Sequence, residues 1–326
     1  MAQITIVLPV YNVEKYLTQC LDSIINQTFK DFECLCINDG STDNSLEILQ
    51  EYAKKDKRFK IITQENKGLL GAWNTGIKNV NTKYLTFIDS DDWITENYLE
   101  VLYNKIEETG ADVVRASYKF YFQEDNAYKS ARIREIHKIT ANSDIERLYK
   151  GYAGAFVWSK IYKTSLIKDN NIWFYDERKS AGDCPFLGLV FLYSKKIAFI
   201  SDELLFYRKH NSSITTNLEK NATDDFCNFI TLTKDLQKRN FNEPKIKEFC
   251  IDFFLYKLGK LGKNISKQTL QKNYSIAIEH IKFLKEMSLD LGFLYKFKIN
   301  FSIFLLNTFK TFSFKIFRIL KNFFKN

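Results

Sequence analysis

The first hundred residues alternate short apolar runs with segments of helical spacing, and no other feature of the chain restricts the fold as strongly. Strands are expected over Ile4–Val10, Phe32–Asn38, Lys60–Thr63 and Tyr84–Ile88. Helices are expected over Glu14–Asn26, around Leu46–Tyr52 and over Leu69–Asn79. Such alternation predicts right-handed crossovers and therefore an α/β fold, in which helices flank a Rossmann-like, mainly parallel central sheet.

The pattern becomes mixed beyond residue 112. Further strands are expected over Val113–Phe122, Ala155–Tyr162 and Leu204–His210, and a helix over Cys184–Tyr193. The polar stretch Asn211–Asn221 is the best candidate boundary, because helical spacing dominates after it. We therefore expect an α/β domain over residues 1–215, a helical extension over 216–290 and a separate tail over 291–326.

Acidic residues follow two of the expected strands. Asp39 comes after the second strand, and Asp89 and Asp91 come after the fourth. Ligands of open α/β sheets bind at the carboxyl ends of the strands. These three carboxylates are therefore expected to converge on one crevice.

The segment Asp89-Ser90-Asp91-Asp92 places three carboxylates within four residues. Like charges repel at this spacing, and proteins tolerate them where a cation or the donors of a ligand neutralise them. Oxygen ligands alone favour a hard ion, Mg²⁺ or Mn²⁺, whose coordination diphosphate oxygens would complete. The alternative is a helix N-terminus, since acids favour the positive end of a helix dipole and a helix is expected near Thr95.

Asp39-Gly40 is a less specific motif, because Asp-Gly turns are common. Its carboxylate could accept a hydrogen bond from a ring N–H or a ribose hydroxyl of a nucleotide. The sequence has no G-x-G-x-x-G after the first strand and no G-x-x-x-x-G-K-[ST] motif, so neither a dinucleotide site nor a P-loop is indicated. A phosphate would need a metal or basic side chains instead.

The net charge of +9 is concentrated in the tail. Residues 291–326 hold seven basic side chains and no acid, so the first 290 residues carry a charge of only +2. A nucleic-acid partner is therefore not expected for the body of the protein.

The same tail holds ten of the 29 Phe residues. At 100° per residue, one face collects Phe301, Phe304, Leu305, Phe309, Phe312, Ile316, Ile319, Leu320 and Phe323, and the opposite face collects Lys310, Arg318, Lys321 and Lys325. This pattern is typical of an interfacial helix on an anionic membrane surface, and the charge-free run Ile299–Phe309 is too short to span a bilayer. The alternative is a helix whose Phe face packs on the protein's own core or on a partner.

Cysteine usage and the N-terminal residues bear on the compartment. Six cysteines without C-x-x-C spacing indicate reduced, mostly buried thiols rather than a disulfide framework or a structural zinc site. The start, MAQITIVLPVYN, lacks the basic segment and cleavage site of a signal peptide. With the basic tail, these features predict a cytoplasmic protein that is peripheral on the inner face of the cell membrane.

Six ordered segments resemble family 2 glycosyltransferases with a GT-A fold: ITIVLPVYNVEKYLTQCLDSIINQTFKDFE, INDGSTDNS, ENKGLLGAWNTGI, YLTFIDSDDW, FYDERKSAGDCPF and YRKHNSSIT. They cover roughly residues 3–215. The resemblance implies an inverting transfer of a sugar from a nucleotide diphosphate donor, which we expect to be a UDP-sugar. The tail suggests that the acceptor is a cell-envelope glycan or a lipid-linked intermediate.

The resemblance also assigns the donor side of the site. Pro9, Tyr11 and Asp39 would hold the nucleoside, with Asp39 on the uracil. Asp91 would bind Mn²⁺ or Mg²⁺, and Asp89 would lie beside that metal, towards the ribose or the donor sugar. The metal would neutralise charge as the diphosphate leaves.

The remaining assignments concern the acceptor and the diphosphate. Asp183 matches the Asp of the family's Glu-Asp pair, whose carboxylate deprotonates the acceptor hydroxyl. Arg208, His210 and Ser213 match the segment that closes on the diphosphate. For His210, a structural role in the loop is the alternative.

Two positions depart from the family pattern. Trp73 stands where the family often has Arg, and it either stacks on a base or sugar or fills core space. Gly182 stands where the Glu of the pair is expected, which removes a charge that would raise the pKa of the base. Asp176 and Glu177 are the alternative bases.

These departures motivate a second hypothesis, a catalytically inactive, membrane-associated protein that binds sugar nucleotides or acts as a scaffold. Retention of Asp39, Asp89, Asp91 and Asp183 argues against it. A nucleotidyltransferase would share the α/β fold and the metal, but it would make diphosphate from a nucleoside triphosphate, whereas a glycosyltransferase releases a nucleoside diphosphate.

Overall fold

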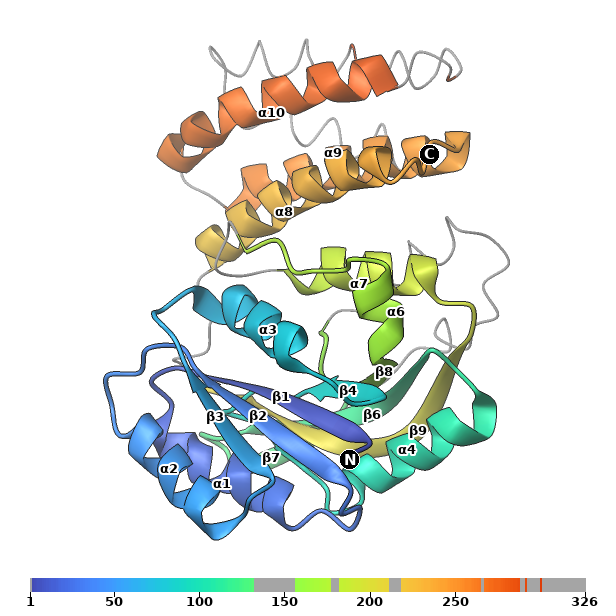
Figure 1. Cartoon of the computed structure of the whole chain (residues 1–326). Coiled ribbons are helices and arrows are strands. Elements are labelled where there is room, and N and C mark those ends of the chain that lie inside the picture. Colours follow the sequence, from blue (N-terminus) through green and yellow to red (C-terminus); the bar gives the residue numbers. More distant parts are fainter. Residues whose placement is uncertain are drawn as a thin grey trace. The chain divides into compact units, whose positions relative to one another are not determined.

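The computed structural model describes residues 2–131, 156–176, 182–210, 218–264 and 267–287, together with Leu291 and Asn300. The chain divides into two compact units, Met1–Ser213 and Ile214–Asn326. The first unit contains a sheet with helices on its faces, and the described part of the second is helical (Figure 1).

The first half of the sheet is parallel. β1 (Ile4–Val10) pairs with β2 (Phe32–Asn38) on one side and with β4 (Tyr84–Phe87) on the other, and β3 (Phe59–Thr63) continues the sheet beyond β2. Every residue of β1 is buried, which explains why its sequence is a continuous apolar run and not an alternating one. The four strands expected from the sequence here are confirmed to within one residue at each end.

Helices cover both faces of this half-sheet. One face carries α1 (Glu14–Ile25), α2 (Ser45–Lys55) and α4 (Tyr98–Thr109), and the other carries α3 (Gly68–Asn79) (Figure 1). Gly76 lets α3 approach β1 closely, because a Cβ atom at this position would lie 2.2 Å from Val7 Cγ1. This packing confirms the α/β class.

The second half of the sheet is mixed. β8 (Lys160–Lys163) runs antiparallel to β4 and to β6 (Val113–Phe122), β9 (Ile197–Lys209) runs parallel to β6, and β5 (Trp93–Ile94) and β7 (Ala127–Ser130) pair antiparallel with β9 and β6. The strand order is β3-β2-β1-β4-β8-β6-β9-β5, with β7 beside β6. Two expected strands have shifted starts: the one expected from Ala155 begins at Lys160, and the one expected from Leu204 begins at Ile197.

The described part of the first unit also contains α6 (Thr164–Asp169) and α7 (Asp183–Tyr193). Trp73 of α3 is 1% exposed, and its ring centroid lies 5.9 Å from that of Phe87 and 4.7 Å from that of Phe174. Of the two interpretations of Trp73, the structure therefore supports the one in which it fills core space.

The second unit contains α8 (Leu218–Lys238), α9 (Pro244–Asn264) and α10 (Lys267–Met287). Phe226, Phe229, Phe254 and His280 are among its buried side chains. Within the described part of the chain, no helix combines the length and the apolar character needed to cross a membrane. The amphipathic helix expected over Phe301–Phe323 lies outside the described residues.

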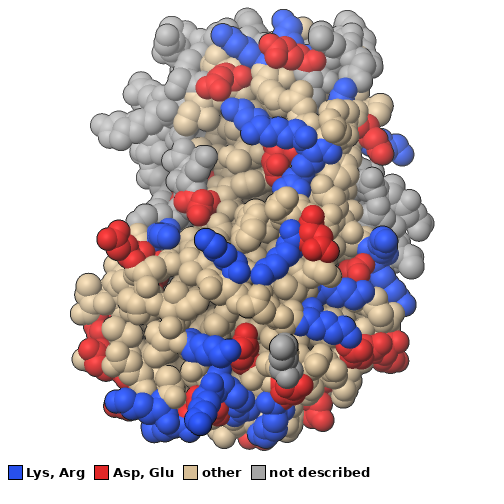
Figure 2. All heavy atoms as spheres, viewed as in Figure 1, with Lys and Arg blue, Asp and Glu red and all other residues tan. Residues whose placement is uncertain are grey.

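Charged side chains of both signs are interspersed on the face of the molecule that Figure 2 shows. This distribution agrees with the nearly balanced charge of the first 290 residues.

Candidate active site

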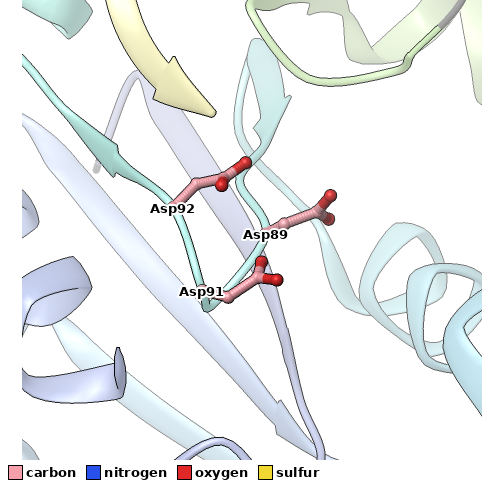
Figure 3. A group of neighbouring side chains, drawn as sticks. All are labelled: Asp89, Asp91 and Asp92. Carbon is pink, nitrogen blue, oxygen red and sulfur yellow. The ribbon is translucent and has the colours of Figure 1, made fainter. Parts of the chain in front are cut away.

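Three aspartates gather in the loop after β4. The side chains of Asp89, Asp91 and Asp92 can each offer one oxygen such that all three oxygens lie within 4.8 Å of one another (Figure 3). Asp89 Oδ1 and Asp92 Oδ2 are buried and accept no hydrogen bond from the described residues. Burial, followed by the charge of Asp91, raises the pKa of both Asp89 and Asp92. A divalent cation would supply the positive charge that these buried oxygens lack, so the donor set fits a Mg²⁺ or Mn²⁺ ion.

The alternative interpretation of these aspartates, a helix N-terminus near Thr95, does not fit the structure. β5 follows Asp92 directly, and α4 begins only at Tyr98, with Asn97 before it. Asp92 Oδ1 instead accepts a hydrogen bond of 2.8 Å from the backbone N–H of Arg208. Asp92 thus ties the loop after β4 to the end of β9.

His210 lies against the aspartate loop. Its Nε2 atom is 3.0 Å from Asp91 Oδ2, and its ring centroid is 4.6 Å from that of Tyr16. The side chains of His210 and Asp91 are 9% and 26% exposed, so the pair lies near the surface of the site and not in the core. This imidazole can hydrogen-bond to the carboxylate or join it as a ligand of one cation.

Arg208 lies behind the same loop and is 5% exposed. Its guanidinium donates to Asp91 O (2.7 Å), to Gln19 Oε1 (2.6 Å) and to Gln123 Oε1 (3.3 Å). The aromatic rings of Tyr16, Trp93 and Tyr121 lie within 4.6–5.5 Å of the guanidinium carbon, a cation–π arrangement. With these contacts, Arg208 supports the backbone of the aspartate loop.

Asp39 lies where the loops after β2 and β3 meet, and it is 2% exposed. Its Oδ1 atom accepts hydrogen bonds from Gln64 Nε2 (2.6 Å) and from the backbone N–H of Lys67 (2.9 Å). Gly40 follows at φ 74°, and a Cβ atom there would lie 3.1 Å from Asn66 N, so this turn requires glycine. The orientation of the Asp39 carboxylate is therefore fixed by the fold.

The residues at the end of β1 lie beside Asp39. The backbone N–H of Asp39 donates to Val10 O (2.9 Å), Pro9 is buried opposite Ile37 of β2, and Tyr11 is 49% exposed. Since β1 lies between β2 and β4, Asp39 and the aspartate loop follow the two strands that flank it. The expected convergence of these acidic residues at one edge of the sheet is thus what the topology produces.

Asp183 is the first residue of α7. Its Oδ2 atom accepts a hydrogen bond of 3.2 Å from the backbone N–H of Val157. Burial raises the pKa of Asp183, whereas the bond from Val157 and the charge of Lys160 act in the opposite direction. The charge of Asp183 also contributes to the raised pKa of Asp89, so the two carboxylates lie within each other's electrostatic reach.

Gly182, the departure from the Glu-Asp pair, has a packing reason. Its φ of −87° is accessible to any residue, but an added Cβ atom would lie 2.6 and 2.7 Å from the two Cδ atoms of Leu70. Leu70 is fully buried. A glutamate would therefore require α3 and α7 to pack differently.

We expect Gly182→Ala to destabilise the protein by about 1–3 kcal/mol, the usual cost of overpacking. Urea unfolding would measure it. In a protein that already carries Leu70→Ala, the added methyl group occupies vacated space, so its cost should fall to near zero. Equal costs in the two backgrounds would contradict the packing explanation.

The remaining sequence candidates are only partly described. Asp176 is exposed, and its Oδ2 atom lies 3.3 Å from Asn74 Nδ2, which also donates to Phe174 O. Glu177 and Ser213 lie outside the described residues.

Sequence reasoning missed two polar residues of the site, Gln19 and Gln64, and it missed the hydrogen bond that Asp92 accepts from the backbone of Arg208. Gln19 and Gln64 acquire their roles only through partners far away in the chain, Arg208 and Asp39. Asp92 belongs to the acidic segment that the sequence singles out, but its position there does not distinguish a residue of the site from a helix cap.

A match to a known family agrees with this geometry. Residues 5–169 match the model of glycosyl transferase family 2, and the chain belongs to that family. The match includes Asp39 and the aspartate loop, whereas Asp183, Arg208 and His210 lie beyond it. The resemblance noted from the six sequence segments is confirmed.

Individual proteins show the same similarity. "Glycosyltransferase GlyA" of Streptococcus pneumoniae is 39% identical over 221 residues, which are 65% of this chain and 31% of GlyA, so the chain spans about a third of that relative. The match to the crystal structure of S. aureus TarS 1–349 in complex with UDP-GlcNAc covers 92% of this chain and 91% of that fragment, with a TM-score of 0.64 and 22% identity.

A more distant structure shares the fold. The mannosyltransferase PcManGT from Pyrobaculum calidifontis, solved with GDP-Man and Mn²⁺, covers 91% of this chain and 86% of its own at a TM-score of 0.53 and 12% identity. These structural matches confirm the GT-A fold.

Proposed function

We propose that this protein transfers a sugar, with inversion, from a UDP-sugar to a hydroxyl group of a cell-envelope glycan or a lipid-linked acceptor. One observation carries the proposal. Three carboxylates, two of which have an unpaired buried oxygen, lie at the carboxyl end of β4, and one of them, Asp89, is within electrostatic reach of a fourth carboxylate at the start of α7. A site for a cation and a separate base are the two parts that an inverting transfer needs.

The donor nucleoside would bind where the loops after β1 and β2 meet. The fixed carboxylate of Asp39 would accept the ring N–H of uracil, and Tyr11 offers an exposed aromatic ring beside it. Pro9 is buried near the end of β1. The UDP-GlcNAc complex of TarS, which shares the fold, supports uracil as the base.

The diphosphate would lie on the aspartate loop. Asp91 and Asp89 would hold Mn²⁺ or Mg²⁺, with Asp92 and His210 as neighbouring donors. When bound, the metal neutralises negative charge on the departing diphosphate. Arg208 keeps the loop in place from behind, so we assign it a positioning role and not a direct contact with phosphate.

Asp183 would act as the base. Its carboxylate takes the proton of the acceptor hydroxyl as the acceptor oxygen bonds to the anomeric carbon. The bond from that carbon to the diphosphate breaks on the opposite face, and its electron pair leaves with UDP. A pKa raised by burial makes this carboxylate a stronger base than a solvated aspartate, which suits proton abstraction near neutral pH.

The test of this function is release of UDP. UDP-GlcNAc, UDP-glucose and UDP-galactose would each be incubated with the full chain, Mn²⁺ and either buffer or extracted cell-envelope glycan. We expect UDP from at least one donor, and more of it with the glycan. Absence of UDP from all three, combined with tight UDP binding, would favour the inactive scaffold. Diphosphate formed from UTP and a sugar phosphate would favour a nucleotidyltransferase.

The tail supports a peripheral membrane location, which we propose for the cytoplasmic face. A chain ending at Asp290 should remain folded but lose binding to vesicles that contain anionic lipid, because seven basic side chains are removed and each contributes roughly 1 kcal/mol near such a surface. Sedimentation with anionic and with neutral vesicles measures this. Equal sedimentation of the full and shortened chains would contradict the tail's role.

A further inference from the structure

A strained turn lies directly before β8, on the side of Asp183. Phe156 and Ser159 both adopt left-handed backbone conformations, with φ values of 62° and 58°. Neither residue is glycine, so each conformation costs energy and persists only where the surroundings enforce it. Two such residues within four positions indicate a turn whose backbone conformation is enforced by its surroundings.

Side chains fasten this turn at several points. Lys160 Nζ donates to Phe156 O (2.5 Å) and to Trp158 O (3.4 Å), and Tyr162 Oη donates to Val157 O (2.6 Å). Ser159 Oγ donates to Ala116 O of β6 (2.9 Å). Lys160 is 1% exposed, which is unusual for a lysine and shows that its ammonium group is used inside the protein.

The turn places one backbone N–H group, that of Val157, next to Asp183. With its carbonyl groups held from behind, the turn directs the N–H of Val157 at Asp183 Oδ2. The same fastening brings the buried charge of Lys160 within electrostatic reach of Asp183. No residue of the turn is part of the donor site described above.

We propose that Lys160 is a positioning residue for Asp183, which it holds in place through the turn Phe156–Ser159. The inference rests on the proposed role of Asp183 as the base. Because Lys160 is 1% exposed, its side chain is not open to a substrate, and we assign it a role through Asp183.

The surrounding charges are consistent with this pairing. Burial and the charge of Arg115 lower the pKa of Lys160, and the charge of Asp183 raises it. Asp183 also lies within electrostatic reach of Tyr162 and Asp89, and Cys184, which follows it in α7, acts on Lys160. Among the described groups near Asp183, Lys160 is the cation that favours the ionised carboxylate.

Lys160→Met tests the proposal, with Lys163→Met as the matched control on the same strand, since Lys163 pairs with Asp112 away from Asp183. Turnover is followed as release of UDP from the donor that gives the highest rate. We expect kcat to fall about 10–100-fold in the Lys160 variant, the range for a misplaced catalytic group, with donor KM unchanged. Lys163→Met should match the parent protein.

A double variant separates this inference from the proposed function. In the Asp183→Asn protein, Lys160→Met should cause no further loss, because the residue it serves is already inactive. An equal fold loss of kcat on adding Lys160→Met to the parent protein and to Asp183→Asn would overturn the positioning role. Full turnover in Asp183→Asn itself would instead overturn the assignment of the base.

Two further measurements test the proposal if Lys160→Met folds poorly. Lys160→Gln keeps a hydrogen-bond donor for the carbonyl groups of the turn, and it should lose less kcat than Lys160→Met. Hydrogen exchange of the intact protein reports on the turn without any turnover. We expect faster exchange at Val157 and Trp158 in Lys160→Met than in Lys163→Met, and equal exchange would count against the proposal.

Discussion

Asp183→Asn is expected to lower kcat by about 10²–10⁴-fold, the usual contribution of a general base, while UDP binding stays within about twofold of the parent protein. The amide retains an oxygen that can accept the hydrogen bond from Val157 N, so the local fold should persist. It cannot take the proton of the acceptor. Steady-state release of UDP and a calorimetric UDP titration together measure both effects.

Asp176→Asn is the informative control for this variant, because Asp176 is the other described candidate for the base and is exposed. It should retain the parent rate. Loss of activity in Asp176→Asn with full activity in Asp183→Asn would move the base to Asp176 and would show that the carboxylate at the start of α7 is structural.

The second large effect concerns the metal. Asp91→Ala should weaken UDP binding in the presence of Mn²⁺ by at least about 10–100-fold, the range found even for residues that merely support metal ligands. Without metal, parent and variant should bind UDP equally weakly. The comparison isolates the metal-dependent part of the affinity, because Asp91 lies in the aspartate loop and not at the nucleoside loops.

Asp125→Asn serves as the control for the same loss of one negative charge, since Asp125 is exposed in the turn between β6 and β7. Its UDP affinity should equal that of the parent with and without Mn²⁺. If Asp91→Ala kept the full Mn²⁺-dependent affinity, the metal would have to lie elsewhere.

Local sequence patterns predicted the parallel half of the sheet, β1 to β4, whose strands follow one another along the chain. The apolar runs of β1 and β2 and the helical spacing of α1 placed those elements to within a residue or so. The acidic segment after β4 could be recognised from the sequence because three aspartates at a strand end indicate a functional site. In these elements, residues that are neighbours in the structure are also close together in the sequence.

The second half of the sheet depends on pairings that no local pattern encodes. β8 enters between β4 and β6, and β9 reaches across to β5, so their antiparallel neighbours are set by the packing of the whole unit. The start of β8 was misplaced for a related reason. The apolar residues before Lys160 read as a strand, but they form the strained turn that faces Asp183.

The supporting residues of the site were also hidden from sequence reasoning. The sequence predicts Arg208 at the diphosphate, but its hydrogen bonds to Gln19 Oε1 and Asp91 O are visible only in the structure. Lys160 belongs to a residue type that normally remains in solvent, so its burial is visible only in three dimensions. Gly182 similarly becomes understandable only beside Leu70.

The most direct test of the central claim is a calorimetric titration of the full chain with UDP, with and without Mn²⁺, and with GDP as the competing nucleotide. We expect tight binding of UDP only when Mn²⁺ is present, and GDP binding at least about tenfold weaker, because guanine is a larger ring system than the uracil that we propose for the site at Asp39. Binding of neither nucleotide, or UDP binding that ignores Mn²⁺, would contradict a metal-dependent UDP-sugar transferase.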